Sequence, residues 1–341
     1  MRPRIVFLVM SAVQPAQTIA EQARVLAPHR VLLHHDFAQT PDFPVAEPNV
    51  VLVPDPKRTG WGVWGFTEGV FHSLRYALDH LQFDYLQVLS PTCLPIKPLT
   101  ALEEHIATGR TEADFSCVDL LEERDGLMTA SYRAFAPEHS LRHRMLRRLS
   151  RVYYGDSSAR HDVAGVQLRA QPLHDSAFSR LRSRIALQVT RAWAHPAIGR
   201  HIFDDKLKPC FGSAWFGARR QVIEWMVERF GQPDIQRYFP RVRLPEELVI
   251  PTLLRNSGFA SGPYNHCIVT FRDANPKWLG DEDFGILARS PAFFARKFPA
   301  DVDTPIRQRV LRELVGFEPG FRTISRRHPC SSALPSESSP A

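Results

Sequence analysis

The chain has 341 residues, a formal net charge of +7, 44% hydrophobic residues and 23% charged residues. These values are those of an ordinary soluble globular protein, with enough sequence for one large α/β domain or two modest ones. No apolar run approaches the roughly 20 residues needed to cross a bilayer, which excludes a predicted membrane-spanning helix.

The first half of the chain alternates between predicted strands and helices. Strands are predicted at 4–10, 30–36, 49–55, 83–90 and 114–120, and helices at 16–26, 64–81 and 99–107. The arginines and apolar run at the start imitate a signal peptide, but the next strand follows one helix length later and favours a buried first strand. The alternation predicts an α/β fold with a mostly parallel sheet flanked by helices.

Ligands bind such sheets outside the carboxyl ends of the strands. The residues predicted along that edge are Ser11, His34, His35, Asp36 and the loop from Ser90 to Pro95. His35 and Asp36 are candidates for contact with a nucleoside, although a structural hydrogen bond explains them equally well. Ser90 is a further candidate for binding the same ligand.

Residues 138–209 are basic, with helical runs such as LRHRMLRRLSR. We interpret them as a helical insertion or lid on the first half, 1–137, without an independent core. A basic surface of this kind is usually solvated, and it is also consistent with acidic glycans or an anionic membrane surface. Nucleic acid ranks last, because no recognisable nucleic-acid module accompanies the charge.

The α/β pattern resumes at Gly212. It continues through a strand at 213–218, a helix at 219–230, a strand at 266–271 and a helix from Asp281. We therefore predict one domain over 1–317, with 210–317 as its second half. The Ser- and Pro-rich residues 318–341 are predicted to form a disordered tail.

The five cysteines are Cys93, Cys117, Cys210, Cys267 and Cys330. They are widely spaced and show neither metal-ligand spacing nor a disulfide framework. We therefore expect reduced thiols and a cytoplasmic protein.

The segment LPEELVIPTLLRNS, 244–257, carries the main candidate site. Pro245 suits the first turn of a helix, and Glu246 and Glu247 follow where the helix dipole favours negative charge. Pro251 is unfavourable inside a helix, so we expect a short or kinked element. On this segment alone, two favourable acids at a helix start are the simpler interpretation.

The motifs of the chain follow one another in a recognisable order: LLHHD, WGVWGFTEGVFHSLRYALD, DYLQVLSPTCLPI, GSAWF, LPEELVIPTLLRNS and SPAFFARKFPADVD. In this order the chain resembles the core-2/I-branching β-1,6-N-acetylglucosaminyltransferases of glycosyltransferase family 14, which also include peptide O-xylosyltransferases, and specifically a soluble bacterial-type member. The resemblance covers roughly 4–314. It implies a GT-A-like fold, inversion at the anomeric carbon, and catalysis without a metal or other cofactor.

The resemblance also assigns roles. Glu247 matches the catalytic base of the family's P-D-E motif, with Glu246 beside it on the acceptor side. Lys297 of ARKF matches the lysine that binds the diphosphate, with Arg296 adjacent. Transfer from a nucleotide sugar needs both a base for the acceptor hydroxyl and a cation for the departing diphosphate.

Two positions depart from the family pattern. Cys93 stands where relatives carry an aspartate, and the family's second diphosphate-binding arginine falls near His266 and Cys267. Arg272 is the candidate replacement for that arginine. These changes permit a different donor or a chain without turnover.

Two further motifs have alternative interpretations. Trp215 of GSAWF either stacks on an acceptor sugar or packs in the core. The acids at 281–283 imitate a metal-binding D-x-D motif, but they precede a predicted helix and suit its first turn. We therefore predict no metal ligands.

The sequence thus predicts a metal-independent inverting glycosyltransferase. It would move a sugar, GlcNAc in β-1,6 linkage, from a UDP-sugar donor to a glycan or glycolipid hydroxyl. It would act in the cytoplasm, with peripheral contact to an anionic membrane as an open option for the basic insertion. The alternatives are a UDP-xylose-dependent xylosyltransferase and a catalytically degenerate glycan-binding protein.

Overall fold

The computed structural model describes residues 2–60, 62–120, 133–137, 140–153, 160–163, 166–169, 181–198, 200–204, 206–272 and 275–318. Cys330 and all but the first residue of the predicted tail lie outside this part of the chain. Within it, no helix is both long enough and apolar enough to cross a membrane.

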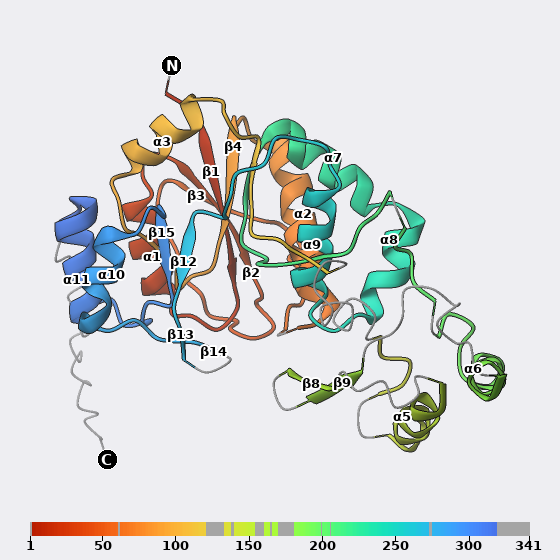
Figure 1. Cartoon of the computed structure of the whole chain (residues 1–341). Coiled ribbons are helices and arrows are strands. Elements are labelled where there is room, and N and C mark those ends of the chain that lie inside the picture. The colour runs from red at the N-terminus through yellow and green to blue at the C-terminus, as the bar shows by residue number, and fades with distance from the viewer. Residues whose placement is uncertain are drawn as a thin grey trace, which may run out of the picture.

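A six-stranded sheet organises the fold, in the order β3-β2-β1-β4-β11-β6 (Figure 1). Its strands are β1 (Ile5–Ser11), β2 (Arg30–His35), β3 (Val50–Leu52), β4 (Tyr85–Leu89), β6 (Ala113–Asp114) and β11 (Gly217–Arg219). The first four pair in parallel, whereas β11 is antiparallel to both β4 and β6. The predicted α/β class is confirmed, with a mixed sheet. Because the chain runs from β1 out to β3 and returns to β4 on the other side of β1, the carboxyl ends of β1 and β4 border the position where such sheets bind ligands.

Helices cover both faces of this sheet. One face carries α1 (Ala16–Val25) and α3 (Leu99–Ala107), and the other carries α2 (Trp64–His80), α7 (Arg220–Phe230) and α9 (Pro245–Arg255) (Figure 1). Along β1, Val6 and Leu8 pack with the second set of helices, and Phe7 and Val9 pack with the first. A strand buried on both faces has to be apolar throughout, which explains the continuous apolar run at the start of the chain.

A three-stranded sheet lies beside the main one, with β15 (Phe294–Arg296) between β12 (Cys267–Val269) and β5 (Leu94–Pro95). The remaining C-terminal elements are β13 (Phe271–Arg272), β14 (Asn275–Pro276), the 3-10 helix η3 (Asp281–Asp283), α10 (Phe284–Arg289), α11 (Pro305–Val310) and the π-helical turn η4 (Leu311–Val315). Because β5 follows shortly after β4, this small sheet places the end of β15 near the carboxyl end of β4. The backbone N–H of Phe298 donates to the carbonyl of Thr92 at 2.9 Å, which fixes the two segments together.

The predicted strand at 114–120 divides into two strands of different sheets. Its first part is β6, and its second is β7 (Val118–Asp119), which pairs with β10 (Cys210–Phe211). This pairing brings Cys117 and Cys210 to a Cα–Cα distance of 5.9 Å, where they form a disulfide. The expectation that all five cysteines are reduced thiols is therefore wrong. The partners are 93 residues apart in sequence and meet only through strand pairing, so their spacing shows no framework.

The basic insertion contains α5 (Leu141–Tyr153), β8 (Arg160–Val163), β9 (Val166–Arg169) and α6 (Leu181–Trp193), and it lies away from the main sheet (Figure 1). It was expected on the first half of the chain, and its described residues contact both that half and the second, the latter at α8 (Pro233–Tyr238) and the 3-10 helix η2 (Phe239–Arg241). The Arg133 guanidinium of the first half donates to the carbonyls of Ala197 and Arg200, and the Phe203 ring centroid lies 5.2 Å from that of Tyr238 and 6.2 Å from that of Phe239. Leu187 and Ile198 form only a small apolar cluster, consistent with an insertion.

Candidate active site

The helix α9 runs continuously past Pro251 instead of breaking there. A proline lacks the N–H that would bond the carbonyl four residues earlier, which here belongs to Glu247. The backbone N–H of Gly212 donates to that carbonyl instead, at 2.9 Å. A Cβ at Gly212 would collide with the Ser116 carbonyl, so only glycine fits this approach. Pro251 and the GSAWF segment therefore fix the backbone of Glu247 together.

The two adjacent carboxylates of α9 have different surroundings. Glu246 is 8% exposed, accepts a hydrogen bond from the Gly62 backbone, and has Oε2 without a partner among the described residues. Burial raises the pKa of Glu246 to about 7, and the neighbouring Glu247 adds to the increase. Glu247 is half-buried; burial raises its pKa, whereas the charge of Arg296 opposes the increase. Glu247 is thus the carboxyl that is both partly accessible and within the field of a cation.

The backbone leading into α9 is also unusual. Leu244 has φ 52 and ψ 53, in the left-handed region that costs a leucine about 1–2 kcal/mol. Its N–H reaches the carbonyl of Gly62 at 3.4 Å, and its carbonyl accepts the N–H of Glu247 at 3.1 Å. Residues with strained backbone occur often at functional sites, where the surrounding structure holds the strained conformation and so positions a functional side chain.

Arg296 and Lys297 each lie over an indole ring. The Arg296 guanidinium is 5.1 Å from the ring centroid of Trp215, and the Lys297 ammonium is 4.3 Å from that of Trp278. Trp278 is 48% exposed, whereas Trp215 is 9% exposed and contacts the core. Burial, followed by the charge of Arg296, lowers the pKa of Lys297. Trp215 therefore packs in the core and supports a cation at the same time, and both cations remain half-buried.

The loop after β4 is held by its own hydrogen bonds. The Ser90 hydroxyl contacts Thr92 Oγ1 at 2.9 Å and Cys93 Sγ at 3.1 Å, and it is almost completely buried. Cys93 and Cys267, the two positions that depart from the family pattern, lie together as buried free thiols linked by a hydrogen bond. Burial would raise the pKa of the Cys93 thiol, but the Cys267 hydrogen bond and the charge of Arg296 outweigh it and lower that pKa. The two buried thiols thus contact each other.

His35 and Asp36 serve the structure of the loops at the end of β2. The ring nitrogens of His35 contact Ser11 Oγ at 3.2 Å and the Thr40 carbonyl at 2.9 Å. The Asp36 carboxylate accepts from the backbone of Thr59 at 2.6 Å, among four hydrogen bonds that outweigh its burial and lower its pKa. The alternative of structural hydrogen bonds is the one that the contacts support for both residues.

Two other predicted features belong to the segment that follows β12. Arg272 is exposed on the β13–β14 hairpin. The acids at 281–283 form a 3-10 turn that leads into α10, and Asp283 accepts the Gly280 N–H at 2.9 Å and the Lys277 ammonium at 3.0 Å. The interpretation of these acids as first-turn residues is therefore confirmed.

The structure brings four predicted residues into one region: Glu247, Arg296, Lys297 and Trp215. Sequence reasoning missed Trp278, the aromatic partner of Lys297, since nothing in its neighbourhood distinguishes it from a scattered surface tryptophan. It also missed the Gly62 contact of Glu246, which depends on a distant loop. The chain matches no protein-family model and no curated protein sequence.

Proposed function

We propose that this chain is an inverting glycosyltransferase that uses a UDP-sugar donor, with GlcNAc in β-1,6 linkage as the first candidate for transfer. The observation that supports it best is the position of Glu247. It is a half-buried carboxyl with a raised pKa, fixed by Gly212 and Pro251, in the field of Arg296. Glycosyl transfer from a diphosphate requires a base and a cation, and a carboxyl with a raised pKa in the field of Arg296, whose chain neighbour Lys297 is a second half-buried cation, fits both needs.

In the proposed reaction, Glu247 takes the proton of the acceptor hydroxyl as that oxygen attacks the anomeric carbon. The new carbon–oxygen bond forms as the bond to the diphosphate oxygen breaks on the opposite side, which inverts the anomeric centre. The electron pair leaves with UDP, whose negative charge Lys297 and Arg296 would stabilise. Both cations stand on indole rings, which limit their motion and so reduce reorganisation in the transition state. This scheme uses no metal or cofactor.

The test is release of UDP from a panel that includes UDP-GlcNAc and UDP-xylose, with and without glycan acceptors. Glu247→Gln is expected to lower transfer by about 10²-fold or more, the scale of general-base catalysis, with donor binding unchanged. The matched control is Glu246→Gln, one residue away but directed toward Gly62, which should cost much less. Loss of transfer in Glu246→Gln alone would assign the base to the other carboxyl.

A glycan-binding protein without turnover is the second candidate. It is favoured by the Cys93–Cys267 pair, which replaces two polar groups of the family pattern with buried thiols. Glycan binding without UDP release from any donor would support it. UDP release with only UDP-xylose would instead support the xylosyltransferase alternative.

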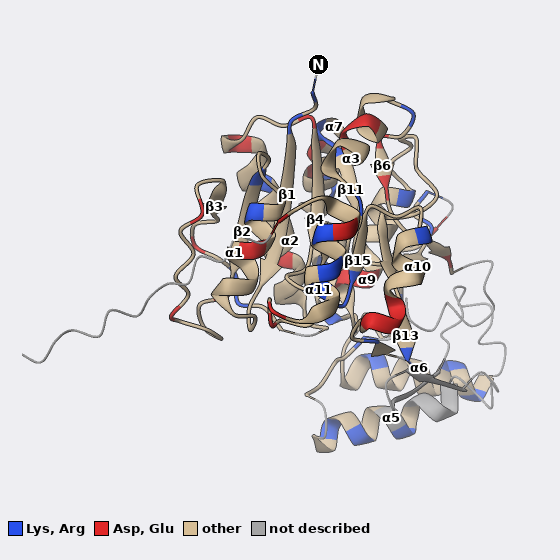
Figure 2. Cartoon of the chain, turned by 90° about the vertical axis from the view of Figure 1, so that its left-hand side faces the viewer, with Lys and Arg blue, Asp and Glu red and all other residues tan. Residues whose placement is uncertain are grey.

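We also propose that the basic insertion docks on an anionic membrane that carries a glycolipid acceptor. The residues Leu181, Ile185, Val189 and Trp193 recur every four positions along α6 and are 72%, 55%, 58% and 46% exposed. The sequences of α5 and α6 contain arginines and no acid (Figure 2). An exposed apolar stripe with a tryptophan and flanking arginines is typical of helices that lie in a membrane interface.

Vesicle flotation separates this proposal from a merely solvated surface. Binding to vesicles with anionic lipid is expected at low salt and should weaken toward physiological salt, with little binding to neutral vesicles. Ile185→Asp should reduce binding, whereas Gln82→Asp, at an exposed position outside the insertion, should reduce it less. Equal flotation of both variants, or none at low salt, would refute the membrane contact and leave the enzyme proposal untouched.

A further inference from the structure

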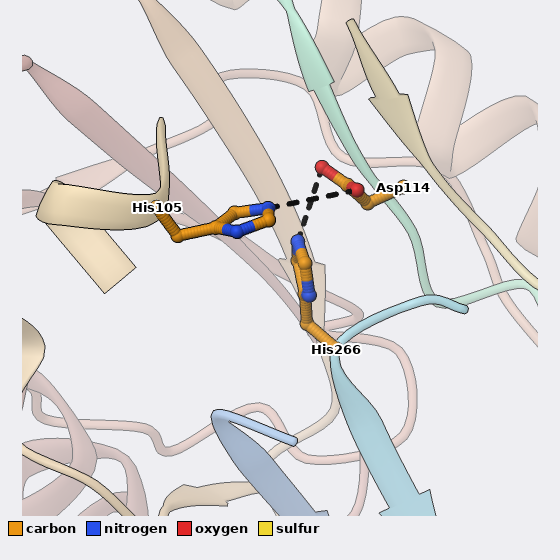
Figure 3. Close-up of side chains that lie close together, drawn as sticks. All are labelled: His105, Asp114 and His266. Atoms are coloured by element: carbon orange, nitrogen blue, oxygen red, sulfur yellow. Dashed lines mark ion pairs between the residues drawn. The ribbon is translucent and has the colours of Figure 1, made fainter. Parts of the chain in front are cut away.

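The side chains of His105, Asp114 and His266 converge in one cluster (Figure 3). His105 lies near the end of α3, Asp114 ends β6, and His266 directly precedes β12. The Nε2 atom of His266 is 3.0 Å from Asp114 Oδ2, and that of His105 is 3.8 Å from Asp114 Oδ1. One ligand atom from each side chain lies within 4.8 Å of the others. The two imidazole planes are nearly perpendicular, at 84°, with ring centroids 4.8 Å apart.

The carboxylate of Asp114 uses only one of its oxygens within the protein. Its Oδ2 accepts the hydroxyl of Tyr85 at 2.7 Å and that of Thr111 at 3.3 Å. Its Oδ1 has no hydrogen-bond partner in the described part of the chain, and neither has Nδ1 of His266. Nε2 of His266 forms an ion pair with Oδ2, whereas Nε2 of His105, at 3.8 Å from Oδ1, is beyond hydrogen-bond length. Asp114 is 0% and His266 1% exposed. Because an unpartnered buried polar atom costs about 1–3 kcal/mol, Asp114 Oδ1 facing Nε2 of His105 without a hydrogen bond indicates a missing partner between these side chains.

The backbone around the cluster is arranged to bring these side chains together. His266 has φ 62, a left-handed conformation that is uncommon for residues other than glycine. Its carbonyl accepts the N–H groups of Phe293 at 3.0 Å and Phe294 at 2.9 Å, which holds it in place. A Cβ at Gly262 would collide with Asp114 Oδ1, so the chain beside the free oxygen has to be glycine.

We propose that His105, Asp114 and His266 bind one transition-metal ion of the zinc class. Two imidazoles and one carboxylate are a ligand set that suits Zn²⁺, whereas Mg²⁺ and Ca²⁺ prefer oxygen ligands alone. Bonds of 2.0–2.1 Å in tetrahedral geometry place ligand atoms about 3.3 Å apart. The observed 3.0 and 3.8 Å run to different oxygens of Asp114, and the ligand atoms lie within 4.8 Å of one another, so the side chains have to close by about 1 Å on the ion. The side chain of His105 is 31% exposed, so it can move inward and leave the fourth position to water.

The hydroxyls of Tyr85 and Thr111 would orient the carboxylate, the usual role of groups that bond a metal ligand. The positive charge of Arg219 acts on His105, but its guanidinium donates to the carbonyls of Thr111 and Ile106 and is therefore directed to the backbone. Val269, three residues after His266, pairs with Arg296. Three strand residues span about 10 Å, so the backbone of His266 lies about that far along the strand from the backbone of Arg296. The ion would link α3, β6 and the start of β12 through its ligands, and it would take no part in the proposed transfer.

Calorimetric titration of the metal-stripped full chain, free of any histidine tag, tests this site. One Zn²⁺ should bind per chain with a rise in melting temperature, while Mg²⁺ should give neither. His105→Ala should weaken zinc binding by more than about 100-fold, and Tyr85→Phe, which removes an orienting hydroxyl, by about 10–100-fold. His80→Ala is the matched control, because His80 is an exposed helix histidine that contacts only its own helix at Tyr76.

Cobalt gives an independent readout, since tetrahedral Co²⁺ has intense visible bands that octahedral Co²⁺ lacks. These bands should form with the unaltered chain and with His80→Ala and should be lost in His105→Ala. If zinc binds His105→Ala as tightly as the unaltered chain, or no 1:1 binding occurs, the cluster is a hydrogen-bonded network and the proposal is refuted. Neither readout depends on sugar transfer, so the proposed function stands or fails separately.

Discussion

Glu246→Gln should change how the stability of the protein depends on pH. Burial raises the pKa of Glu246 from 4.5 to about 7 in the folded chain. Below pH 4.5 both the folded and unfolded chains hold the proton, so the shift has no effect on stability. Between pH 4.5 and 7 the unfolded chain loses the proton while the folded chain keeps it, and stability falls as pH rises. Above pH 7 the whole penalty applies.

The size of the effect follows from the shift. A difference of about 2.5 pKa units, at 1.36 kcal/mol per unit, corresponds to about 3 kcal/mol. Glutamine cannot ionise, and its side-chain carbonyl can still accept the Gly62 N–H. The variant should therefore gain up to about 3 kcal/mol relative to the unaltered chain between pH 4.5 and pH 8.

The assay is urea unfolding of Glu246→Gln and of the unaltered chain at pH 4.5, 6 and 8. The quantity compared at each pH is the difference between their unfolding free energies. Glu224→Gln serves as the control, because Glu224 is 53% exposed and pairs with Arg220 on the surface of α7. A difference between Glu246→Gln and the unaltered chain that stays constant with pH would refute the inference that Glu246 is held neutral. It would also remove the physical reason for preferring Glu247 as the base.

Three further predictions concern the candidate site and its frame. Lys297→Ala should lower transfer by about 10²-fold or more, and Arg272→Ala, at an exposed position, should lower it much less. Excess EDTA should leave transfer by the unaltered chain unchanged below the melting temperature. Loss of transfer in EDTA with recovery in manganese would contradict the metal-free scheme. Gly212→Ala should destabilise the fold by about 2 kcal/mol or more, because the new Cβ meets the Ser116 carbonyl, and an unchanged urea midpoint would show that the loop can shift. Cys117→Ser should cost roughly 2–4 kcal/mol in urea unfolding without reductant, and no difference from the unaltered chain would mean that Cys117 and Cys210 are not joined in solution.

Local patterns in the sequence were sufficient to predict most elements of the first half. The helices predicted at 64–81 and 99–107 correspond to α2 (Trp64–His80) and α3 (Leu99–Ala107), because their apolar spacing reflects the period of the helix itself. The same holds for the acids at the start of α9, whose place depends only on the helix dipole and the preceding proline. The functional resemblance rests on the order of such motifs and remains a proposal.

Tertiary structure alone decided which groups meet. Adjacent acids look equivalent in sequence, but packing buries Glu246 against Gly62 and leaves Glu247 in the field of Arg296. Pro251 does not break its helix, because a distant N–H, from Gly212, takes the carbonyl that the proline leaves free. Cys117 with Cys210, and His105 with His266, converge from distant segments. The physical reason is the same in each case: backbone geometry acts over a few residues and leaves a periodic trace in the sequence, whereas a contact between distant segments depends on how whole elements pack.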